Sequence, residues 1–352
     1  MKRKKAINFL IVTLFAGVLL TFTLYIGIGT LFNSDESSED SKGFNKMFYS
    51  ENVLSEFARY IDYKIFGHID GGDYIIGDDD WLFEAVDSQN GYERLLDYIG
   101  ADPFDEQELD RIASIISDRA LLYEDNGVQY MMVVIPDSIT VCSDKVPGYL
   151  GNQSENTRLA QLTAKLAGQD VNEFINPTHA MIDESGEIAM YNNTENSINA
   201  YGAYCIYNTV VAEFMADTGM EVERLHRDDV DFYTRLTDGK TIARNAGIES
   251  IVKNSTVTLS DDMLDNYTVV SSEAGAITTE RDDANENSTE YFVVLECTNS
   301  WDRIQLMPYF SNTFDKVIYR DYLLSDHYAS SYSGVTLVVQ VIRESELASI
   351  TR

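Results

Sequence analysis

Residues Tyr291–Tyr309 read Y-F-V-V-L-E-C-T-N-S-W-D-R-I-Q-L-M-P-Y, and this stretch organises the rest of the chain. The apolar run 291–295 predicts a buried strand. The turn 298–300 predicts a helix that begins near Trp301, with Asn299 or Ser300 as its cap. A serine between a strand and a helix is lifted to the edge of a sheet, where the helix N-terminus favours negative charge. Ser300 is therefore a candidate nucleophile, and the alternative is that it only caps the helix.

Acidic residues greatly outnumber basic ones. The chain has 26 Lys and Arg against 58 Asp and Glu, a formal net charge of −32. Only four charged residues, all basic, precede position 35, so the remainder carries 22 basic and 58 acidic residues, a net charge of −36. Such a surface repels nucleic acid, anionic lipid and anionic polymers. A neutral glycan or a cationic partner is easier to accommodate.

The N-terminal segment has the features of an uncleaved membrane anchor. Residues 6–32 are uncharged and almost wholly apolar, which is long enough to cross a bilayer. The basic tail 1–5 precedes them, so the positive-inside rule places that tail in the cytoplasm. The apolar run is too long for a signal peptide and lacks an Ala-x-Ala-like exit. We therefore expect a single-pass protein of the cell membrane, with an acidic, Ser-rich linker at 33–46 and an extracytoplasmic domain at 47–352.

Cysteines and histidines are few and lack metal-ligand spacing. Cys142, Cys205 and Cys297 each lie in or beside an apolar run, which favours three buried thiols, and one disulfide with one free thiol is the alternative. The four histidines contain no His-x-x-x-His pair. We therefore expect neither a metal site nor a cofactor.

The order of apolar patterns predicts an α/β fold with a mostly parallel sheet and helices on both faces, of the flavodoxin-like three-layer type. The segment 221–288 interrupts this order and is interpreted as a β-containing insertion. The predicted elements are a hairpin at 74–83, helices at 105–124, 159–166 and 199–218, and strands at 128–135, 171–175, 316–319 and 335–342. In such a sheet ligands bind beyond the C-terminal strand ends. The loops there are 136–150, 176–186, 192–200, 297–301 and 321–334.

From residue 73 to 346, apart from the insertion, the order of motifs resembles the alginate O-acetyltransferase-like branch of the SGNH hydrolase superfamily, which includes a group named for an Asp-His-His-Trp motif. The family's Thr-Asp-x-His-Trp-Asn-x-x-Gly-Ala segment aligns with residues 194–203, and its Asp-Ser-Phe nucleophile turn with 299–301. Further matches are Gly77 with Trp81-Leu82-Phe83, Pro136-Asp137-Ser138, Val146-Pro147, and Met-Pro-Tyr-Phe at 307–310.

This resemblance assigns roles to positions at which the chain has changed. In the family a histidine is the general base, an aspartate orients it and a serine carries the acyl group. Here those positions hold Ser197, Glu195 and Ser300, and the aspartate before the nucleophile is Asn299. A hydroxyl is far too weak a base to take the nucleophile's proton near neutral pH. The resemblance therefore implies a serine-hydrolase scaffold without its general base.

One histidine could substitute for the missing base. His327 lies in the loop after strand 316–319, on the sheet edge predicted for Ser300, but it lacks the Asp-x-x-His spacing of many SGNH hydrolases. The alternative is that His327 is a solvated loop residue. Residues placed to contact a ligand at this edge are Asn199, Tyr201, Trp301 and Tyr328.

Three hypotheses about function follow. The first is a catalytically impaired relative that binds a neutral glycan, or serves a cell-surface polysaccharide acetylation or export assembly together with a membrane acyltransferase. The second is an active serine O-acetyltransferase or esterase on a cell-surface glycan. The third is a structural or sensory ectodomain without a ligand.

Overall fold

The computed structural model describes residues 59–60, 62–63, 73–87, 90–186, 188–260, 264, 266–273, 275–282, 291–322 and 334–350. All of them belong to one unit, Arg59–Arg352. No helix within these ranges combines the length and the apolar character that a bilayer crossing requires. The predicted tail, anchor and linker at 1–46 lie outside the described residues.

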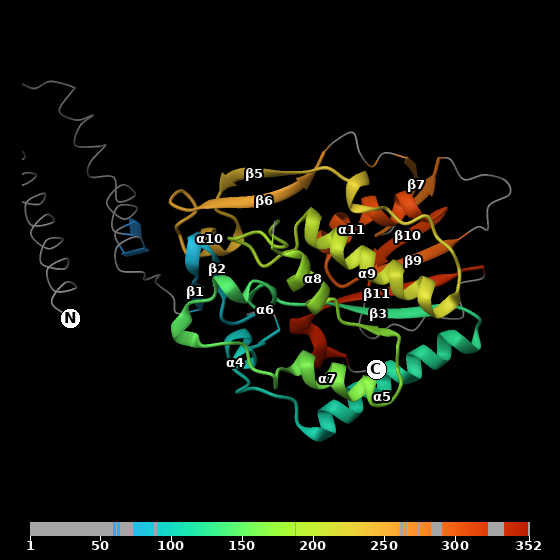
Figure 1. The fold of residues 1–352 in the computed structure, drawn as a ribbon, viewed down its shortest axis with the longest axis horizontal. Coiled ribbons are helices and arrows are strands. Elements are labelled where there is room, and N and C mark those ends of the chain that lie inside the picture. The colour runs from blue at the N-terminus through green and yellow to red at the C-terminus, as the bar shows by residue number, and fades with distance from the viewer. Residues whose placement is uncertain are drawn as a thin grey trace, which may run out of the picture. The chain divides into compact units, whose positions relative to one another are not determined.

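A mostly parallel sheet lies at the centre of the unit (Figure 1). Within the described ranges its strand order is β4-β3-β11-β9-β10-β8-β7. The first five strands are parallel, and β8 and β7 are antiparallel. The strands are β3 (Gln129–Ile135), β4 (Phe174–Ile175), β7 (Tyr267–Glu273), β8 (Ala276–Arg281), β9 (Phe292–Cys297), β10 (Lys316–Asp321) and β11 (Leu337–Arg343). The predicted α/β class and mostly parallel sheet are confirmed.

Helices cover both faces of this sheet. They are α4 (Arg94–Tyr98), α5 (Glu106–Asp125), α6 (Ser138–Val141), α7 (Arg158–Ala167), α8 (Thr178–Glu184), α9 (Ala200–Thr218), α10 (Thr241–Asn245) and α11 (Ser300–Thr313). Side chains alternate along each strand. Val293 and Leu295 pack with α9 and α11, whereas Val294 packs with α5 and α7 on the other face. Two apolar clusters, one on each face, therefore bury the parallel strands.

Polar caps fix where the long helices begin. Asp105 caps α5 in a capping box with Glu108. Asn199 caps α9, and Asn299 caps α11 by accepting hydrogen bonds from the backbone N–H groups of Trp301 and Asp302. All three helices begin within two residues of the predicted positions. The cap of α11 is Asn299 rather than Ser300, so the Ser300 hydroxyl is not used for capping.

The three cysteines are buried free thiols, as the sequence favoured. Burial raises the pKa of the Cys205 thiol to about 12 and that of the Cys297 thiol well above its usual range. Because the thiolate is the reactive form, these side chains are inert packing groups at neutral pH.

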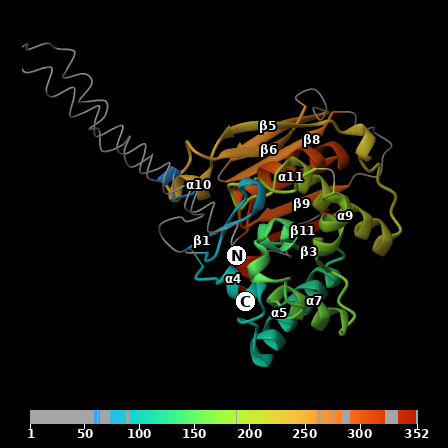
Figure 2. The same cartoon turned by 60° about the vertical axis from the view of Figure 1, so that its left-hand side comes forward.

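The segment 221–288 contains two hairpins, of which one is separate from the main sheet and the other extends it. Strands β5 (Phe232–Asp238) and β6 (Lys253–Leu259) pair with each other and lie on the α9 side of the sheet, where Phe232 contacts Tyr201 edge to face (Figure 2). Strands β7 and β8 instead extend the main sheet, because β8 pairs antiparallel with β10. Only the first hairpin is thus an excursion from the α/β core. The short hairpin of β1 (Tyr74–Ile76) and β2 (Leu82–Glu84) forms as predicted.

Candidate functional site

Three parallel strands end side by side at the predicted functional edge. The register places Arg343 of β11 opposite Ile135 of β3, and Val341 opposite Cys297 of β9. The residues that follow these strands therefore meet at one place. They include Asp137 after β3, the cap Asn299 after β9, and Glu344 after β11.

The loop 192–199 is fixed to this edge by side chains of its own. The amide of Asn193 donates to the carbonyl of Lys253 over 3.1 Å. The hydroxyl of Thr194 donates to Oδ1 of Asn254 over 2.7 Å. Both partners lie on β6, so the first hairpin of the 221–288 segment holds the loop in place.

Within this loop, Glu195 and Ser197 are linked by the side chain of Asn192. Its Nδ2 donates to Ser197 Oγ over 3.1 Å and to Glu195 Oε2 over 3.5 Å. Glu195 also accepts from the Thr241 hydroxyl of α10 over 3.1 Å. Glu195 and Ser197, the residues that the sequence resemblance aligns with the acid and base positions, are therefore neighbours. An asparagine amide, which cannot act as a base near neutral pH, lies between them.

A very small cavity separates this loop from α11. Ser197 and Ile198 line one side, and Asp302 of α11 and Arg343 of β11 line the other. Its volume is about 10 Å³, room for one water molecule at most. Asp302 and Arg343 form a bidentate ion pair, with Nε 2.6 Å from Oδ2 and Nη2 3.0 Å from Oδ1. The loop and the first turn of α11 are thus brought together as predicted, with an ion pair beside Ser197.

The candidate nucleophile does not line this cavity, although Asp302, two residues further along α11, does. Ser300 is the first residue of α11 and is exposed, and its hydroxyl has no hydrogen-bond partner among the described residues. The next residue, Trp301, is 46% exposed on the same turn. The helix N-terminus beside Ser300 favours negative charge. The hydroxyl is accessible, but within the described part of the chain nothing activates it.

The other predicted site residues fall into two groups. His327 and Tyr328 lie outside the described residues. Asn199 and Tyr201 are buried and are used by the fold: the Asn199 amide caps α9 and donates to the carbonyl of Ala189 over 2.7 Å, and Tyr201 packs in the core beside Phe232. Of the histidines that the structure does describe, His179 and His226 are exposed, and neither lines the small cavity.

A buried arginine behind the loop organises a cluster of carboxylates that the sequence patterns did not indicate. Arg94 is 3% exposed and binds Glu84 and Asp87 at 2.9 Å each, and Asp137 at 3.1 Å. Asn196 joins the cluster when its amide is oriented with the oxygen 2.8 Å from Arg94 Nη2. The sequence around Arg94 gives little indication of this cluster. Arg94 begins a helix of only five residues, and its partners come from three separate segments of the chain.

Glu344 stands at the same cluster with an excess of negative charge around it. Its Oε2 accepts from the Asp137 backbone N–H over 2.7 Å and from the Thr140 hydroxyl over 3.2 Å. The side chain is 1% exposed. Burial, and then the charge of Asp137, raise the pKa of Glu344 well above its usual range. The folded protein therefore holds this carboxyl in its protonated form at pH values where the unfolded chain has released the proton.

This shift predicts that stability falls as pH rises. The unfolded chain loses the Glu344 proton near the usual value of 4.5, and the folded chain keeps it to higher pH. The native state is therefore progressively disfavoured from about pH 4.5 up to the folded pKa. Glu344→Gln imitates the protonated form and should remove up to about 1.4 kcal/mol per pH unit from this slope.

Urea unfolding between pH 5 and pH 8 measures the slope in both proteins. We expect the stability difference between the variant and wild type to be small at pH 5 and to grow in favour of the variant up to pH 8. Parallel slopes would show that Glu344 ionises normally in the folded protein. Glu213→Gln, on the exposed face of α9, is the matched control.

The architecture is that of a three-layer α/β protein, with a serine between a parallel strand and the helix that follows it. A solved structure of similar fold is PatB1 from Bacillus cereus with a sulfonyl adduct, at a TM-score of 0.52 and 14% identity over 79% of this chain and 96% of that chain. A DHHW family protein from Eubacterium siraeum gives a TM-score of 0.48 at 13% identity, over 78% of this chain and 97% of that chain. The O-acetyltransferase domain of Pseudomonas putida AlgJ gives 0.46 at 14% identity, over 78% and 92%.

The resemblance predicted from the order of motifs is thereby confirmed, and at these identities the likeness is one of fold. No protein-family model and no curated protein matches the sequence. What the chain does must therefore be argued from its own residues.

Proposed function

We propose that this chain is a catalytically impaired relative of the serine O-acetyltransferases that binds a glycan at the cell surface. One observation carries the proposal. The position at which the family has its general base is Ser197, whose hydroxyl is bonded to the Asn192 amide and faces a cavity of about 10 Å³. A cavity of this size cannot hold an imidazole ring unless the residues that line it, among them Asp302 and Arg343, move.

The expected decrease in reaction rate supports an impaired relative over an active enzyme. Removal of a general base lowers the rate about 10²–10⁴-fold. Here the base is replaced by a hydroxyl, the orienting aspartate by Glu195, and the aspartate before the nucleophile by Asn299. Glu195 is bonded to Thr241 and Asn192, neither of which can take up a proton from Ser300 near neutral pH.

Charge and the expected cellular setting favour a neutral glycan as the ligand. The net charge of −32 repels anionic polymers. An apolar anchor at 6–32 would hold the domain outside the cell, close to the membrane. A membrane acyltransferase of a polysaccharide acetylation or export assembly would then be its neighbour. In such an assembly a domain that binds the glycan without turning it over presents or retains the polymer.

The active-enzyme alternative is favoured by one feature, the exposed Ser300 hydroxyl at the N-terminus of α11. It would require a base, either His327 or a water molecule relayed through Glu195. In either case Ser300→Ala would abolish the release of acetate from an acetylated glycan, and His327→Gln would abolish it only if His327 is the base.

A binding experiment tests the proposed function. We expect the full chain to bind a neutral oligosaccharide from a glycan panel, and Ser300→Ala to bind it with unchanged affinity, because no covalent step is needed. Isothermal titration calorimetry measures both affinities. The absence of any ligand across the panel would contradict the proposal and leave a structural or sensory ectodomain.

A further inference from the structure

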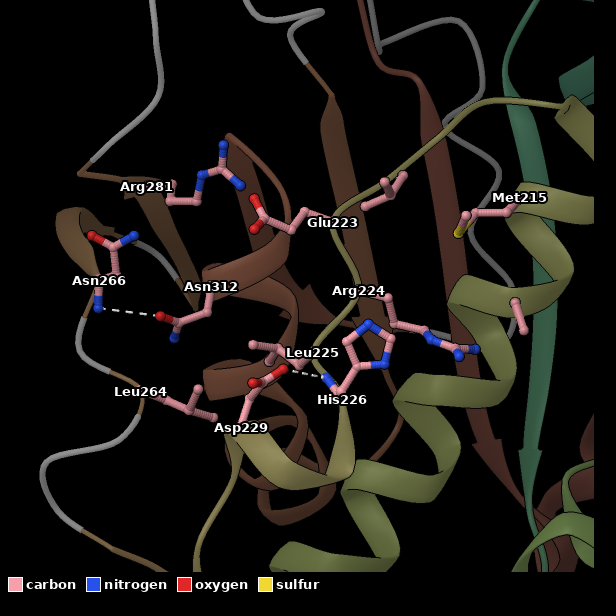
Figure 3. Close-up of a pocket in the computed structure, with 12 residues that line it drawn as sticks. Met215, Glu223, Arg224, Leu225, His226, Asp229, Leu264, Asn266, Arg281 and Asn312 are labelled. Carbon is pink, nitrogen blue, oxygen red and sulfur yellow. Dashed lines mark hydrogen bonds between the residues drawn. The ribbon is translucent and has the colours of Figure 1, made fainter.

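A large groove lies near the N-terminal ends of the parallel strands, whereas Ser300 lies at their C-terminal ends. The groove has a volume of about 870 Å³ and lies between the C-terminal half of α9, the segment 222–229, the end of α11 and the end of β8 (Figure 3). The volume is within the range of small-ligand sites. Helix α11 begins at Ser300 and contributes Asn312 to the groove. At 1.5 Å per residue, the groove is roughly 20 Å from the serine.

The walls of the groove offer both hydrogen-bond donors and acceptors. The Arg224 guanidinium has no hydrogen bond or ion pair within the described part of the chain. Asp229 accepts from the His226 backbone N–H through Oδ2 over 2.8 Å, and its Oδ1 has no hydrogen bond to a described residue. Figure 3 shows Glu223 facing Arg281 across one end of the groove, with Arg224 and His226 at the other.

Apolar side chains lie between these polar groups. Met215 of α9, Val222 and Leu225 line the same space. Leu225 is held in place because its backbone N–H donates to the hydroxyl of Tyr207 over 3.0 Å. The polar groups thus border an apolar surface, an arrangement that fits a ligand with hydroxyls at its rim and C–H groups on its face.

The balance of charge in the groove differs from that of the whole chain. Arg224 shares the groove with the carboxylates Glu223 and Asp229, and Arg281 is paired with Asp315, which does not line the groove, whereas the chain as a whole carries −32. An anion would need donors alone and a cation acceptors alone, but a sugar hydroxyl both donates and accepts. A neutral polyhydroxylated ligand therefore matches this groove best.

We propose that this groove, rather than the serine edge, is where the chain binds a neutral oligosaccharide. The proposal rests on the glycan-binding function proposed above and gives it a location. Arg224 donates to ring or hydroxyl oxygens, Glu223 and Asp229 accept from hydroxyls, and Met215 and Leu225 contact the C–H face of a sugar ring.

The test compares two double variants of the full chain that carry the same change in charge. Glu223→Gln with Arg224→Gln alters the groove, and Glu213→Gln with Arg244→Gln alters exposed residues of α9 and α10 that do not line it. The probes are cellohexaose and chitohexaose, with a hexamer of mannuronate as the anionic counterpart. Calorimetry measures the affinities, and circular dichroism checks that each variant is folded.

We expect the groove variant to bind the neutral probe roughly tenfold more weakly, because it loses two charge-assisted hydrogen bonds. The control variant and Ser300→Ala should stay within about twofold of wild type, since isolated exposed charges contribute little. Asn266→Ala, which removes a second polar group of the groove, should also weaken binding.

Three results would contradict the proposal in different ways. If wild type binds a neutral probe and the groove variants bind it equally well, the glycan function stands and its location in this groove is wrong. If wild type prefers the mannuronate hexamer, the neutral class of ligand is wrong. If wild type binds none of the probes, the proposed function itself fails, and this proposal fails with it.

Discussion

Arg343→Met is expected to lower the free energy of unfolding by about 3–5 kcal/mol, because it leaves a buried carboxylate without its cation. Asp302 is 1% exposed, and both of its oxygens bind Arg343. The ion pair lines the cavity beside Ser197, so its loss loosens this region of the candidate site. Urea unfolding at pH 7 measures the effect.

A double variant isolates the ion pair. Arg343→Met combined with Asp302→Leu removes both charges, and we expect it to be more stable than Arg343→Met alone, since no uncompensated charge remains. A loss below about 1 kcal/mol in Arg343→Met would mean that solvent reaches Asp302 and that loss of the pair does not loosen this region.

Arg94→Met is expected to be at least as destabilising, about 3–5 kcal/mol or more. It removes the cation shared by Glu84, Asp87 and Asp137, which then repel one another in a buried place. Protonation relieves that repulsion, so the variant should regain stability as the pH falls from 8 to 5. Thermal unfolding across this pH range shows both effects.

Arg244→Met is the matched control for this variant. Arg244 lies exposed on α10, and its side chain makes no hydrogen bond or ion pair with a described residue. We expect its unfolding to stay close to that of wild type. Equal losses in the two variants would show that Arg94 contributes no more than a surface charge, which would contradict its role as the centre of the cluster.

The elements predicted correctly are those with strong local signals. The strand β9 follows from five consecutive apolar residues, and α11 begins where Asn299 can cap it. The same holds for α5, where Asp105 and Glu108 form a capping box. In each case the residues that determine the element lie within a few positions of one another, so the sequence is sufficient.

The pairing of strands that are far apart in the sequence could not be predicted from local patterns. The strands β7 and β8 have ordinary alternating patterns, and nothing local indicates that β8 pairs with β10, 36 positions further along from Glu280 to Lys316. The carboxylate cluster around Arg94 likewise depends on contacts between residues that are far apart in the sequence. Arg94 meets Asp137 only because β3 ends beside α4, and Glu344 meets them because β11 pairs with β3.

The candidate site contains one feature that the sequence predicted and one that it did not. The strand order placed loop 192–200 and the turn 297–301 at one edge, and the structure brings Ser197 and Asp302 of these two segments to the same cavity. The ion pair that fills the space was not predicted, since Arg343 lies 41 residues from Asp302. Residue types at aligned positions can be compared from the sequence alone, but the side chains that occupy the space between two segments depend on the fold.

The release of acetate from an acetylated oligosaccharide, together with fluorophosphonate labelling of Ser300, tests the central claim most directly. The account predicts that the full chain neither turns over the ester nor labels above the level of Ser300→Ala. Turnover by wild type that is abolished in Ser300→Ala would contradict it, because a working base would then be present, and its loss in His327→Gln as well would identify that base.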